Sequence, residues 1–483
     1  MNRLKQLSKD SVIYGLGGVL GKGVSFFLLP IYTRIFTPSD YGNIEMMSVI
    51  ISLLSVILSI GLDSAQSFFF FEQRPKGKEA QAEMITSILQ WRIFWGVIIV
   101  LIAGGLSPLL NAWFFGGKLT WVYFAISFSS AFFGMIMNQS LEIFRLQYKA
   151  WTFIIITIAN TLLASALILT FVIFLNLGIL GYFLGSAIAA FATAFLGWWI
   201  ARSYIRFSII HYSWWPRLIK FGLPLLPAEL GFFVMNTSDR WFVRHYMGEE
   251  SLGIFSIAAK FAILMAFAID MFRKAWWPLA MDAMHSEDGK DTFRTIARLY
   301  MGLGSAAVVY LTFLSPWLVK ILTTSSYYSA YSIIGIMAWQ PLFYGFYLIG
   351  SAGIWKVEKT YITSILMCLT GLLNIFLNYL WVPVFGAIGA AIANSVAYFV
   401  WIMVSIFISE RLWRVNFNIY LLLAQIGIGA AIVVFLYNIP EYTAITIILV
   451  HLIVAVLVFS SINAAAKKMI LQKIKKYKAE IFK

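Results

Sequence analysis

Charged residues are scarce in this chain: 12% of its 483 residues are Asp, Glu, Lys or Arg, whereas 61% are hydrophobic. Soluble domains carry about 25% charged residues, so the composition excludes an ordinary soluble protein and indicates membrane-spanning helices. Short strands of alternating polar and apolar residues are lacking, which excludes an outer-membrane barrel. A single cysteine, Cys368, excludes a disulfide bond within the chain.

Patterns typical of catalysis and metal binding are also lacking. The glycine-rich residues 15–23, GLGGVLGKG, fail the phosphate-loop spacing, because Leu16 stands where glycine is required and Gly23 where Ser or Thr is required. No two histidines have metal-ligand spacing among His211, His245, His285 and His451. We therefore expect no catalytic residue, no metal site, no cofactor and no enzymatic activity.

Long apolar segments take up most of the chain. A membrane-spanning helix needs about 20 largely apolar residues, and the polar breaks leave fourteen such segments. The expected spans are 11–36, 41–71, 85–108, 119–145, 149–175, 179–204, 217–246, 250–280, 294–322, 328–354, 359–383, 385–409, 416–438 and 442–465.

Basic residues gather in alternate loops, although the net charge of +15 alone would be compatible with nucleic-acid binding. Residues 72–78, 145–149, 202–220, 355–359 and 409–414 are basic loops on the side that carries both termini; on the other side the loops have one basic residue, Lys118. Cytoplasmic loops carry the excess of Lys and Arg. The pattern predicts cytoplasmic N- and C-termini and no nucleic-acid partner.

The sequence repeats itself at a spacing of about 210 residues. YKAW (148–151) matches EKTY (358–361), and Gly178 and Gly42 correspond to Gly386 and Gly253. An even number of spans per half makes the repeats parallel. We expect an all-α polytopic membrane protein of about 14 transmembrane helices, with two six-helix repeats and two appended helices. Its parts are a first lobe (1–204, spans 1–6), a cytoplasmic linker (205–216), a second lobe (217–411, spans 7–12), spans 13 and 14 (412–466) and a basic cytoplasmic tail (467–483).

Ionisable residues within the spans are the candidate functional residues, because each costs roughly 2.5–3.5 kcal/mol at a helix centre. Spans 1, 2, 7 and 8, the first two of each repeat, carry most of them, and the excess is cationic. Interaction with the outer membrane interface is an alternative role for Arg34 and Arg244, and a local pair with Asp239 is one for Arg240. The predicted substrate-binding residues are Lys22, Arg34, Arg240 and Lys260; the predicted charge partners or ion-coupling residues are Glu45, Asp63, Glu229, Asp239 and Asp270.

A cationic path suits an amphiphile with a phosphate linker and a polar glycan, since Lys and Arg replace the hydration that the phosphates lose. Its lipid tail would stay in the bilayer. We expect Arg240 to face this path, with Asp239 or Glu45 holding it in place when substrate is absent.

Two segments of the chain resemble the bacterial polysaccharide flippases, the Wzx-type branch of the multidrug/oligosaccharidyl-lipid/polysaccharide exporter superfamily. They are GKGVSFFLLPIYTRIFTPSDYGNIEMMSVI (21–50) and NTSDRWFVRHYMGEESLGIFSIAAKFA (236–262). The resemblance implies a V-shaped pair of six-helix bundles, alternating access, and transfer of undecaprenyl-diphosphate-linked oligosaccharide to the outer leaflet of the bacterial cytoplasmic membrane. It also implies that cations such as Arg34, Arg240 and Lys260 recognise the pyrophosphate.

Three other functions stay open. A peptidoglycan-precursor flippase of the same superfamily would use the two extra C-terminal helices, and a cation-coupled multidrug exporter would favour twelve spans and a carboxylate-rich cavity. A membrane glycan polymerase or ligase would need a large external loop, which the sequence lacks. The expected partners are the lipid-linked oligosaccharide of O-antigen, capsule or a similar polysaccharide, membrane lipids, and a glycan polymerase or other export-assembly proteins.

Overall fold

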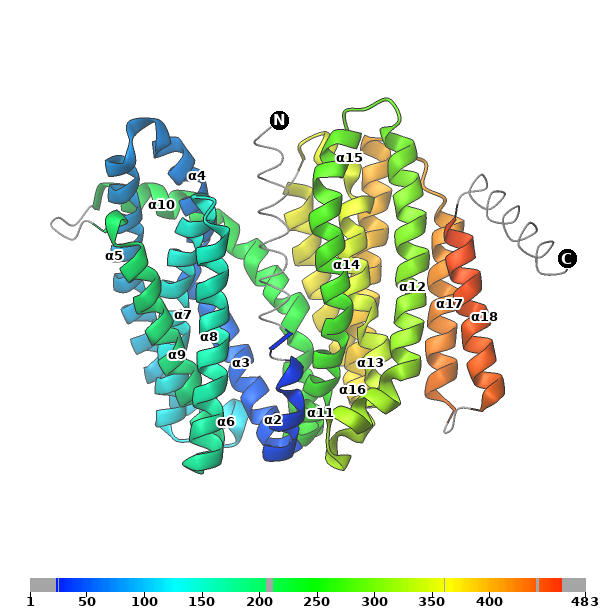
Figure 1. Cartoon of the computed structure of the whole chain (residues 1–483), viewed down its shortest axis with the longest axis horizontal. Helices are drawn as coiled ribbons and strands as arrows, with labels where there is room; N and C mark the ends of the chain where they lie inside the picture. The colour runs from blue at the N-terminus through cyan, green and yellow to red at the C-terminus, as the bar shows by residue number, and fades with distance from the viewer. Residues whose placement is uncertain (1–22, 25, 206–211, 360, 440–442, 463–483) are drawn as a thin grey trace, which may run out of the picture. The chain divides into compact units, whose positions relative to one another are not determined.

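The computed structural model describes residues 23–24, 26–205, 212–359, 361–439 and 443–462, and within these ranges the chain is helical without β-strands (Figure 1). The helices are α2 (Leu29–Ile35), α3 (Pro38–Ser59), α4 (Leu62–Gln73), η1 (Arg74–Lys76), α5 (Lys78–Gly105), α6 (Ser107–Phe115), α7 (Trp121–Leu146), α8 (Ala150–Leu169), η2 (Thr170–Phe174), α9 (Gly178–Ile200), η3 (Arg202–Tyr204), η4 (Tyr212–Trp214), α10 (Trp215–Gly222), η5 (Leu223–Leu225), α11 (Leu226–Ala283), α12 (Gly289–Leu322), η6 (Ser325–Ala330), α13 (Tyr331–Met337), α14 (Trp339–Gly350), α15 (Ala352–Lys356), α16 (Tyr361–Leu412), α17 (Ile419–Tyr437) and α18 (Ala444–Ser461).

Eleven helical stretches in the described ranges are long and apolar enough to cross a membrane. Two of them are each a pair of helices joined at a glycine, because the backbone leaves helical geometry at Gly248 in α11 and at Gly386 in α16. Counted as pairs, they bring the total to thirteen of the fourteen expected spans. Only the second half of the other expected span, 11–36, belongs to the described residues. The all-α polytopic fold is confirmed.

Local sequence explains where the helices of the first repeat begin. At the start of α3 the Thr37 hydroxyl accepts from the Asp40 backbone N–H at 3.2 Å, and the Asp40 carboxylate accepts from the Thr37 N–H at 3.0 Å. This reciprocal cap satisfies two donors that have no partner within the helix. Pro38 occupies the first helical turn, where its missing N–H costs nothing. The TPSD loop thus fixes where the second span begins.

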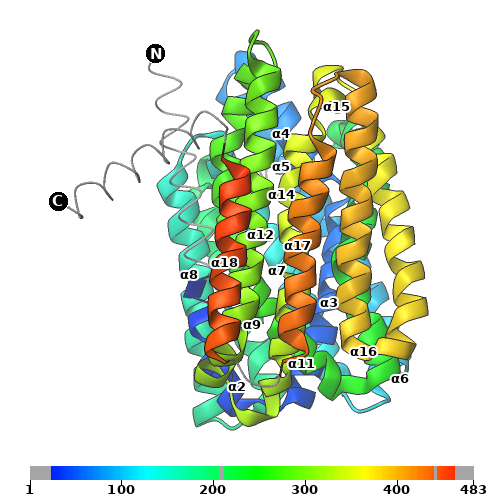
Figure 2. The same ribbon diagram turned by 90° about the vertical axis from the view of Figure 1, so that its right-hand side faces the viewer.

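The chain forms two compact units, one of residues 1–256 with 367–390 and one of residues 257–366 with 391–483. In the first unit, apolar side chains of α4, α5, α7, α8, α9 and α10 form one core, with Phe69, Ile88 and Phe144 among them. In the second, α12, α17 and α18 lie side by side and share a core that includes Phe313 and Leu457 (Figures 1 and 2). The division into lobes at 205–216 concerns the sequence repeat and stays a prediction.

The sequence repeat is also seen in the backbone geometry of two equivalent turns. One precedes α8 and the other precedes α16, and each contains a residue with left-handed geometry, at φ 59° for Tyr148 and φ 58° for Glu358. Two backbone hydrogen bonds recur in both turns at the spacing of 210 residues. They are Tyr148 to Arg145 and Lys149 to Phe144 in the first turn, and Glu358 to Trp355 and Lys359 to Ile354 in the second.

Candidate functional site

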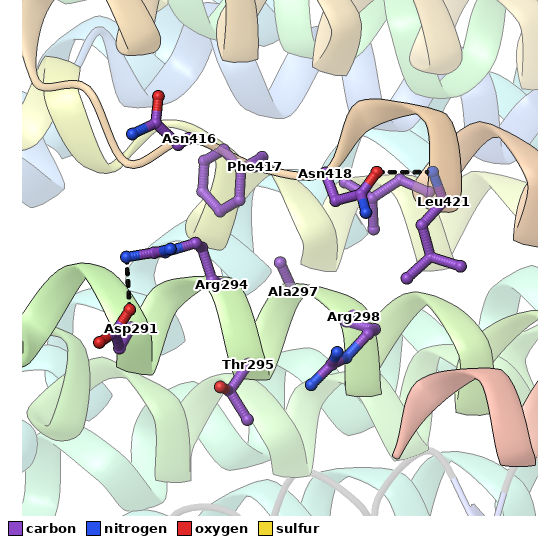
Figure 3. A pocket seen from close by; sticks show the side chains of 10 residues that line it. Asp291, Arg294, Thr295, Ala297, Arg298, Asn416, Phe417, Asn418 and Leu421 are labelled. Atoms are coloured by element: carbon purple, nitrogen blue, oxygen red, sulfur yellow. Dashed lines mark hydrogen bonds and ion pairs between the residues drawn. The ribbon is translucent and has the colours of Figure 1, made fainter. Parts of the chain in front are cut away.

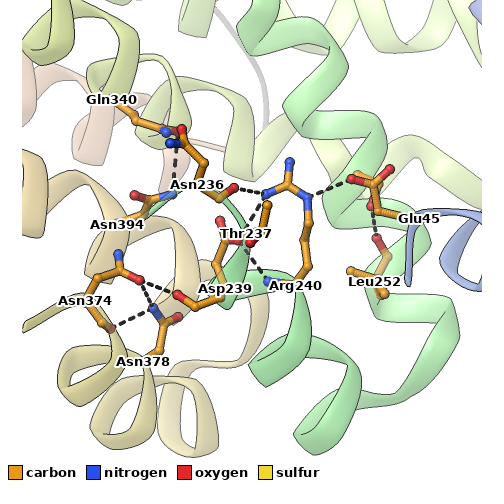
Figure 4. Close-up of polar contacts among 12 residues, drawn as sticks. Glu45, Asn236, Thr237, Asp239, Arg240, Leu252, Gln340, Asn374, Asn378 and Asn394 are labelled. Atoms are coloured by element: carbon orange, nitrogen blue, oxygen red, sulfur yellow. Dashed lines mark hydrogen bonds and ion pairs between the residues drawn. The ribbon is translucent and has the colours of Figure 1, made fainter. Parts of the chain in front are cut away.

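Arg240, in the first helix of α11, is hydrogen-bonded to two carboxylates (Figure 4). Its Nε donates to Glu45 at 2.7 Å, and one terminal nitrogen donates to Asp239 at 3.0 Å and to the backbone oxygen of Asn236 at 2.7 Å. The exposed fractions of the side chains are 18% for Arg240, 14% for Glu45 and 1% for Asp239. The guanidinium is therefore held inside the protein by its partners.

Two helices from different repeats form this Arg240 cluster (Arg240, Asp239 and Glu45). Glu45 lies in the second turn of α3, in the first repeat, and is 195 residues from Arg240 in the sequence. One arginine between two carboxylates gives a formal net charge of −1. A buried ion pair is stable only when its remaining hydrogen-bonding groups are satisfied, and here the Asp239 carboxylate also accepts from the Arg240 backbone N–H at 2.8 Å.

Two buried amides of α16 form a row beside α11 within the first unit. The Ser238 hydroxyl donates to the Asn374 side chain at 2.6 Å, and the Asn378 amide donates to the same oxygen at 3.0 Å. Asn374 and Asn378 of α16 have no exposed surface. Because buried amides need partners, this row fixes the orientation of α11 beside the Arg240 cluster.

A second set of ion pairs lies where α11 breaks at Gly248. Glu249 pairs with Lys118 at 2.5 Å and with Arg244 at 3.5 Å, and Arg244 also donates to the backbone oxygen of Phe114 at 3.0 Å. Glu249 belongs to the connection between two spans, and its hydrogen bond from the Lys118 ammonium holds the pKa of Glu249 below its ordinary value. These contacts join the connection before α7 to α11.

Gly42 and Gly253, related by the sequence repeat, form a reciprocal backbone contact. A Cβ atom on Gly42 would lie 1.9 Å from the backbone oxygen of Glu249, and one on Gly253 would lie 1.9 Å from that of Pro38. Both contacts follow the same spacing of 211 residues. Glycine lets helix backbones approach this closely, so the first turn of α3 and the helix after Gly248 meet at a point of local two-fold symmetry.

The other candidate carboxylates of the first unit lie apart from the Arg240 cluster in the sequence and in their contacts. Asp63 pairs at 2.6 Å with Arg92, which also donates to the backbone oxygen of Met135 at 3.2 Å. Glu229 is partly buried and has a backbone hydrogen-bond partner at Gly61. The structure thus brings Arg240, Asp239 and Glu45 together and gives Asp63 a different cation.

The remaining candidate residues have separate surroundings. Arg34 is exposed and donates to the backbone oxygen of Pro30 at 2.6 Å, within its own helix. Lys22 lies outside the described residues. Lys260 and Asp270 belong to the second unit, where Lys260 is partly buried and Asp270 pairs with Arg273 at 3.3 Å.

Several residues of these networks were not among the sequence candidates. Arg92 was detectable as a lone arginine in the apolar run 85–108, whereas Asn374 and Asn378 carry no charge and merge into the hydropathy of their span. Glu249 has a partner 131 residues away, which no local pattern indicates. Across the described ranges no three His, Cys, Asp or Glu side chains are grouped to hold a metal ion.

Comparison with known sequences identifies a family and two relatives. A family model described as polysaccharide biosynthesis protein matches residues 7–284. A Haemophilus influenzae protein of the Lsg locus is 26% identical over 282 residues, which are 57% of this chain and 66% of that protein. A second H. influenzae protein, described as an uncharacterized membrane protein, is 24% identical over 283 residues, 58% of this chain and 66% of its own. The chain therefore spans just under two thirds of the length of these curated relatives.

Solved structures share the fold. The lipid II flippase MurJ in an inward closed conformation has a TM-score of 0.71 at 17% identity, covering 92% of this chain and 98% of its own. An inward-facing multidrug transporter of the MATE family in the MOP superfamily has a TM-score of 0.68 at 14% identity, covering 84% of this chain and 99% of its own. At these identities the similarity shows the fold alone.

Proposed function

Because the chain belongs to the polysaccharide biosynthesis protein family, we propose that this polytopic membrane protein is a flippase for a lipid-linked oligosaccharide. It moves an undecaprenyl-diphosphate-linked glycan, destined for O-antigen, capsule or a similar polysaccharide, from the inner to the outer leaflet of the bacterial cytoplasmic membrane. It does so by alternating access, as a transporter and not an enzyme, with both termini cytoplasmic. Glycan polymerases and other export-assembly proteins are proposed partners.

The observation that carries this proposal is a guanidinium held by carboxylates from two repeats. The Arg240 fork suits a diphosphate, which accepts two parallel hydrogen bonds from it. Without substrate the Arg240 guanidinium is already paired with Glu45 and Asp239, so in this proposal a diphosphate displaces one carboxylate when it binds. Glu45 is the group to be displaced, because Asp239 is almost fully buried and also hydrogen-bonds the α11 backbone.

Displacement of Glu45 links substrate binding to movement. Glu45 is on the first repeat and Arg240 on the second, so exchanging the carboxylate for a diphosphate removes a contact that holds α3 to α11. The ion pairs of Glu249 and the contact of Gly42 with Gly253 also join the repeats and must rearrange before the repeats can separate at this end. A ligand shifts such an equilibrium only through its differential affinity for the two states.

The remaining candidates have supporting roles in this proposal. Lys22, Arg34 and Lys260 supply further positive potential along the substrate path. Moving a substrate with two negative charges outward is favoured by an inside-negative potential, at up to ~2.3 kcal/mol per charge per 100 mV. If an ion is coupled, Glu229 is the best carboxylate to carry it, because Asp63 and Asp270 are paired with arginines.

Two related functions compete with this one. The MurJ-like fold and the appended α17 and α18 favour a peptidoglycan-precursor flippase, and the MATE-like fold is compatible with a drug exporter. The cationic excess among the span charges argues for an anionic substrate over drug cations.

Reconstitution into liposomes tests the proposal. The purified protein should move a fluorescent undecaprenyl-diphosphate oligosaccharide between leaflets without ATP, and faster than it moves lipid II or an organic cation. Preference for lipid II would favour the peptidoglycan-precursor function, and export of the cation alone would refute a glycan flippase. A strict requirement for ATP would contradict the proposed energy source.

A further inference from the structure

A pocket of about 460 Å³ lies between the start of α12 and the connection from α16 to α17, in the second unit (Figure 3). The helices α12 and α17 are both candidate membrane spans, and the pocket lies where they begin. It is therefore at the level of a membrane–water interface. Its lining residues are Asp291, Arg294, Thr295, Ala297, Arg298, Asn416, Phe417, Asn418, Leu421 and Leu422.

The polar side of the pocket favours an anion. Arg294 and Arg298 are four residues apart and so share a face of α12, while Asp291 is the one carboxylate among the lining residues and pairs with Arg294. Among the lining side chains, two guanidinium groups and one carboxylate give a formal charge of +1. Asn418 stands across from them (Figure 3), and its amide nitrogen adds a hydrogen-bond donor on the other wall.

The wall opposite α12 is fixed by the fold before any ligand binds. Glu410 accepts hydrogen bonds from the backbone N–H groups of Val415, Asn416 and Phe417, at 3.2, 3.0 and 3.4 Å. The Asn418 side chain accepts from the Leu421 N–H at 3.1 Å and so caps α17. A preformed pocket with a few convergent polar groups is typical of a binding site.

The apolar side of the pocket distinguishes a lipid from a soluble anion. Phe417, Leu421 and Leu422 line the pocket, and the α17 surface next to it is apolar and exposed, with Tyr420 88% accessible. In a membrane this surface contacts acyl chains. A soluble phosphate would use only the arginines, whereas a phospholipid would use the arginines and the apolar surface together.

We propose that this pocket binds the phosphate headgroup of an anionic phospholipid of the surrounding membrane, with its acyl chains along α17. Basic pockets between membrane helices suit such headgroups. The site shares no residue with the Arg240 cluster, and its occupant is a resident lipid and not the transported glycolipid.

Lipid titration of the delipidated full-length protein tests the proposal. Phosphatidylglycerol added to the detergent-solubilised protein should bind in native mass spectra and raise the Tm, and phosphatidylcholine should do neither to the same extent. The double variant Arg294→Gln/Arg298→Gln should bind phosphatidylglycerol about tenfold or more weakly, since each cation contributes ~1 kcal/mol. The control Arg74→Gln/Lys76→Gln removes two exposed cations from η1 and should bind as the wild type does.

Two further measurements decide what occupies the pocket. Photoactivatable phosphatidylglycerol should label wild-type peptides that contain residues 291–298 or 416–422, and this readout does not depend on the folding of any variant. Glycerol phosphate should give no Tm shift at the same concentration; an equal shift would show a soluble-phosphate site. Labelling confined to other peptides, or unchanged binding by the folded Arg294→Gln/Arg298→Gln variant, would overturn the proposal.

Discussion

Two arginines of the first unit are buried against carboxylates, yet they join different parts of the chain. Arg92 pairs with Asp63, 29 residues away in the same repeat, whereas Arg240 pairs with Glu45 across 195 residues and from the other repeat. The distribution of exposure also differs. Arg92 is 1% exposed and its carboxylate is half-exposed, with Asp63 at 52%. In the Arg240 cluster the cation and both carboxylates are largely buried.

This difference distinguishes an ion pair that stabilises the fold from one that changes in the proposed transport cycle. In the proposed transport cycle a pair within one repeat keeps its partners, so we expect the Arg92–Asp63 pair to stabilise α4 and α5 throughout. A pair between repeats changes when they separate, and a buried arginine deprived of its carboxylate needs another anion. The proposed substrate supplies that anion.

The largest effect is expected from a single methyl group placed between the repeats. Gly253→Ala puts a Cβ atom against the Pro38 backbone oxygen, and a backbone cannot give way as a flexible side chain can. Overpacking of this kind costs typically 1–3 kcal/mol or more, so the Tm should fall by several degrees and glycan export should be lost. The matched control is Gly134→Ala, where no atom lies within 4 Å of the new Cβ. Equal Tm and export for the two variants would contradict the symmetric contact.

An intermediate effect, confined to stability, is expected at Arg92. Arg92→Ala removes the hydrogen bonds to Asp63 and to the Met135 backbone oxygen, at a cost of roughly 1–3 kcal/mol. Because protein leaves half of the Asp63 side chain uncovered, the loss of Arg92 does not leave its carboxylate enclosed. The amount of protein in the membrane and its Tm should fall, while export per molecule stays near the wild-type value. A loss of export at normal abundance would assign Arg92 to the transport path.

The smallest effect is expected at Lys118, an exposed residue whose pair with Glu249 is accessible to solvent and salt. Such pairs contribute about 0–1 kcal/mol, so Lys118→Gln should change export by about twofold or less. The pKa of Glu249 is lowered, so the pair is present at neutral pH and is lost only as the pH falls through the lowered folded-state value. The Tm difference between wild type and variant should therefore shrink only in acid; a difference that grows in acid would be contrary to this account.

Much of the fold followed from the sequence, because hydropathy and loop charge act locally. The span pattern, the repeat spacing and the pairing of Arg240 with Glu45 or Asp239 were predicted, and the structure has both carboxylates on Arg240. Arg92 and Asp63 meet through packing of α4 on α5, and Glu249 meets Lys118 across 131 residues, so neither pair has a local sequence signal. Hydropathy also carries no signal for the backbone contact of Gly42 with Gly253, which depends on how closely two helices approach.

The most direct test of the central claim is liposome flipping by two charge-conserving double variants. Glu45→Gln/Arg240→Gln leaves the formal charge of the Arg240 cluster at −1 and gives Asp239 an amide donor in place of the guanidinium, and the rates are compared at matched amounts of inserted protein. Its flipping rate should nevertheless fall about 10- to 100-fold, the worth of a charged hydrogen bond to phosphate. Asp63→Asn/Arg92→Gln exchanges the pair within one repeat and should flip at nearly the wild-type rate. Wild-type flipping by Glu45→Gln/Arg240→Gln would show that Arg240 only stabilises the fold and would contradict the account.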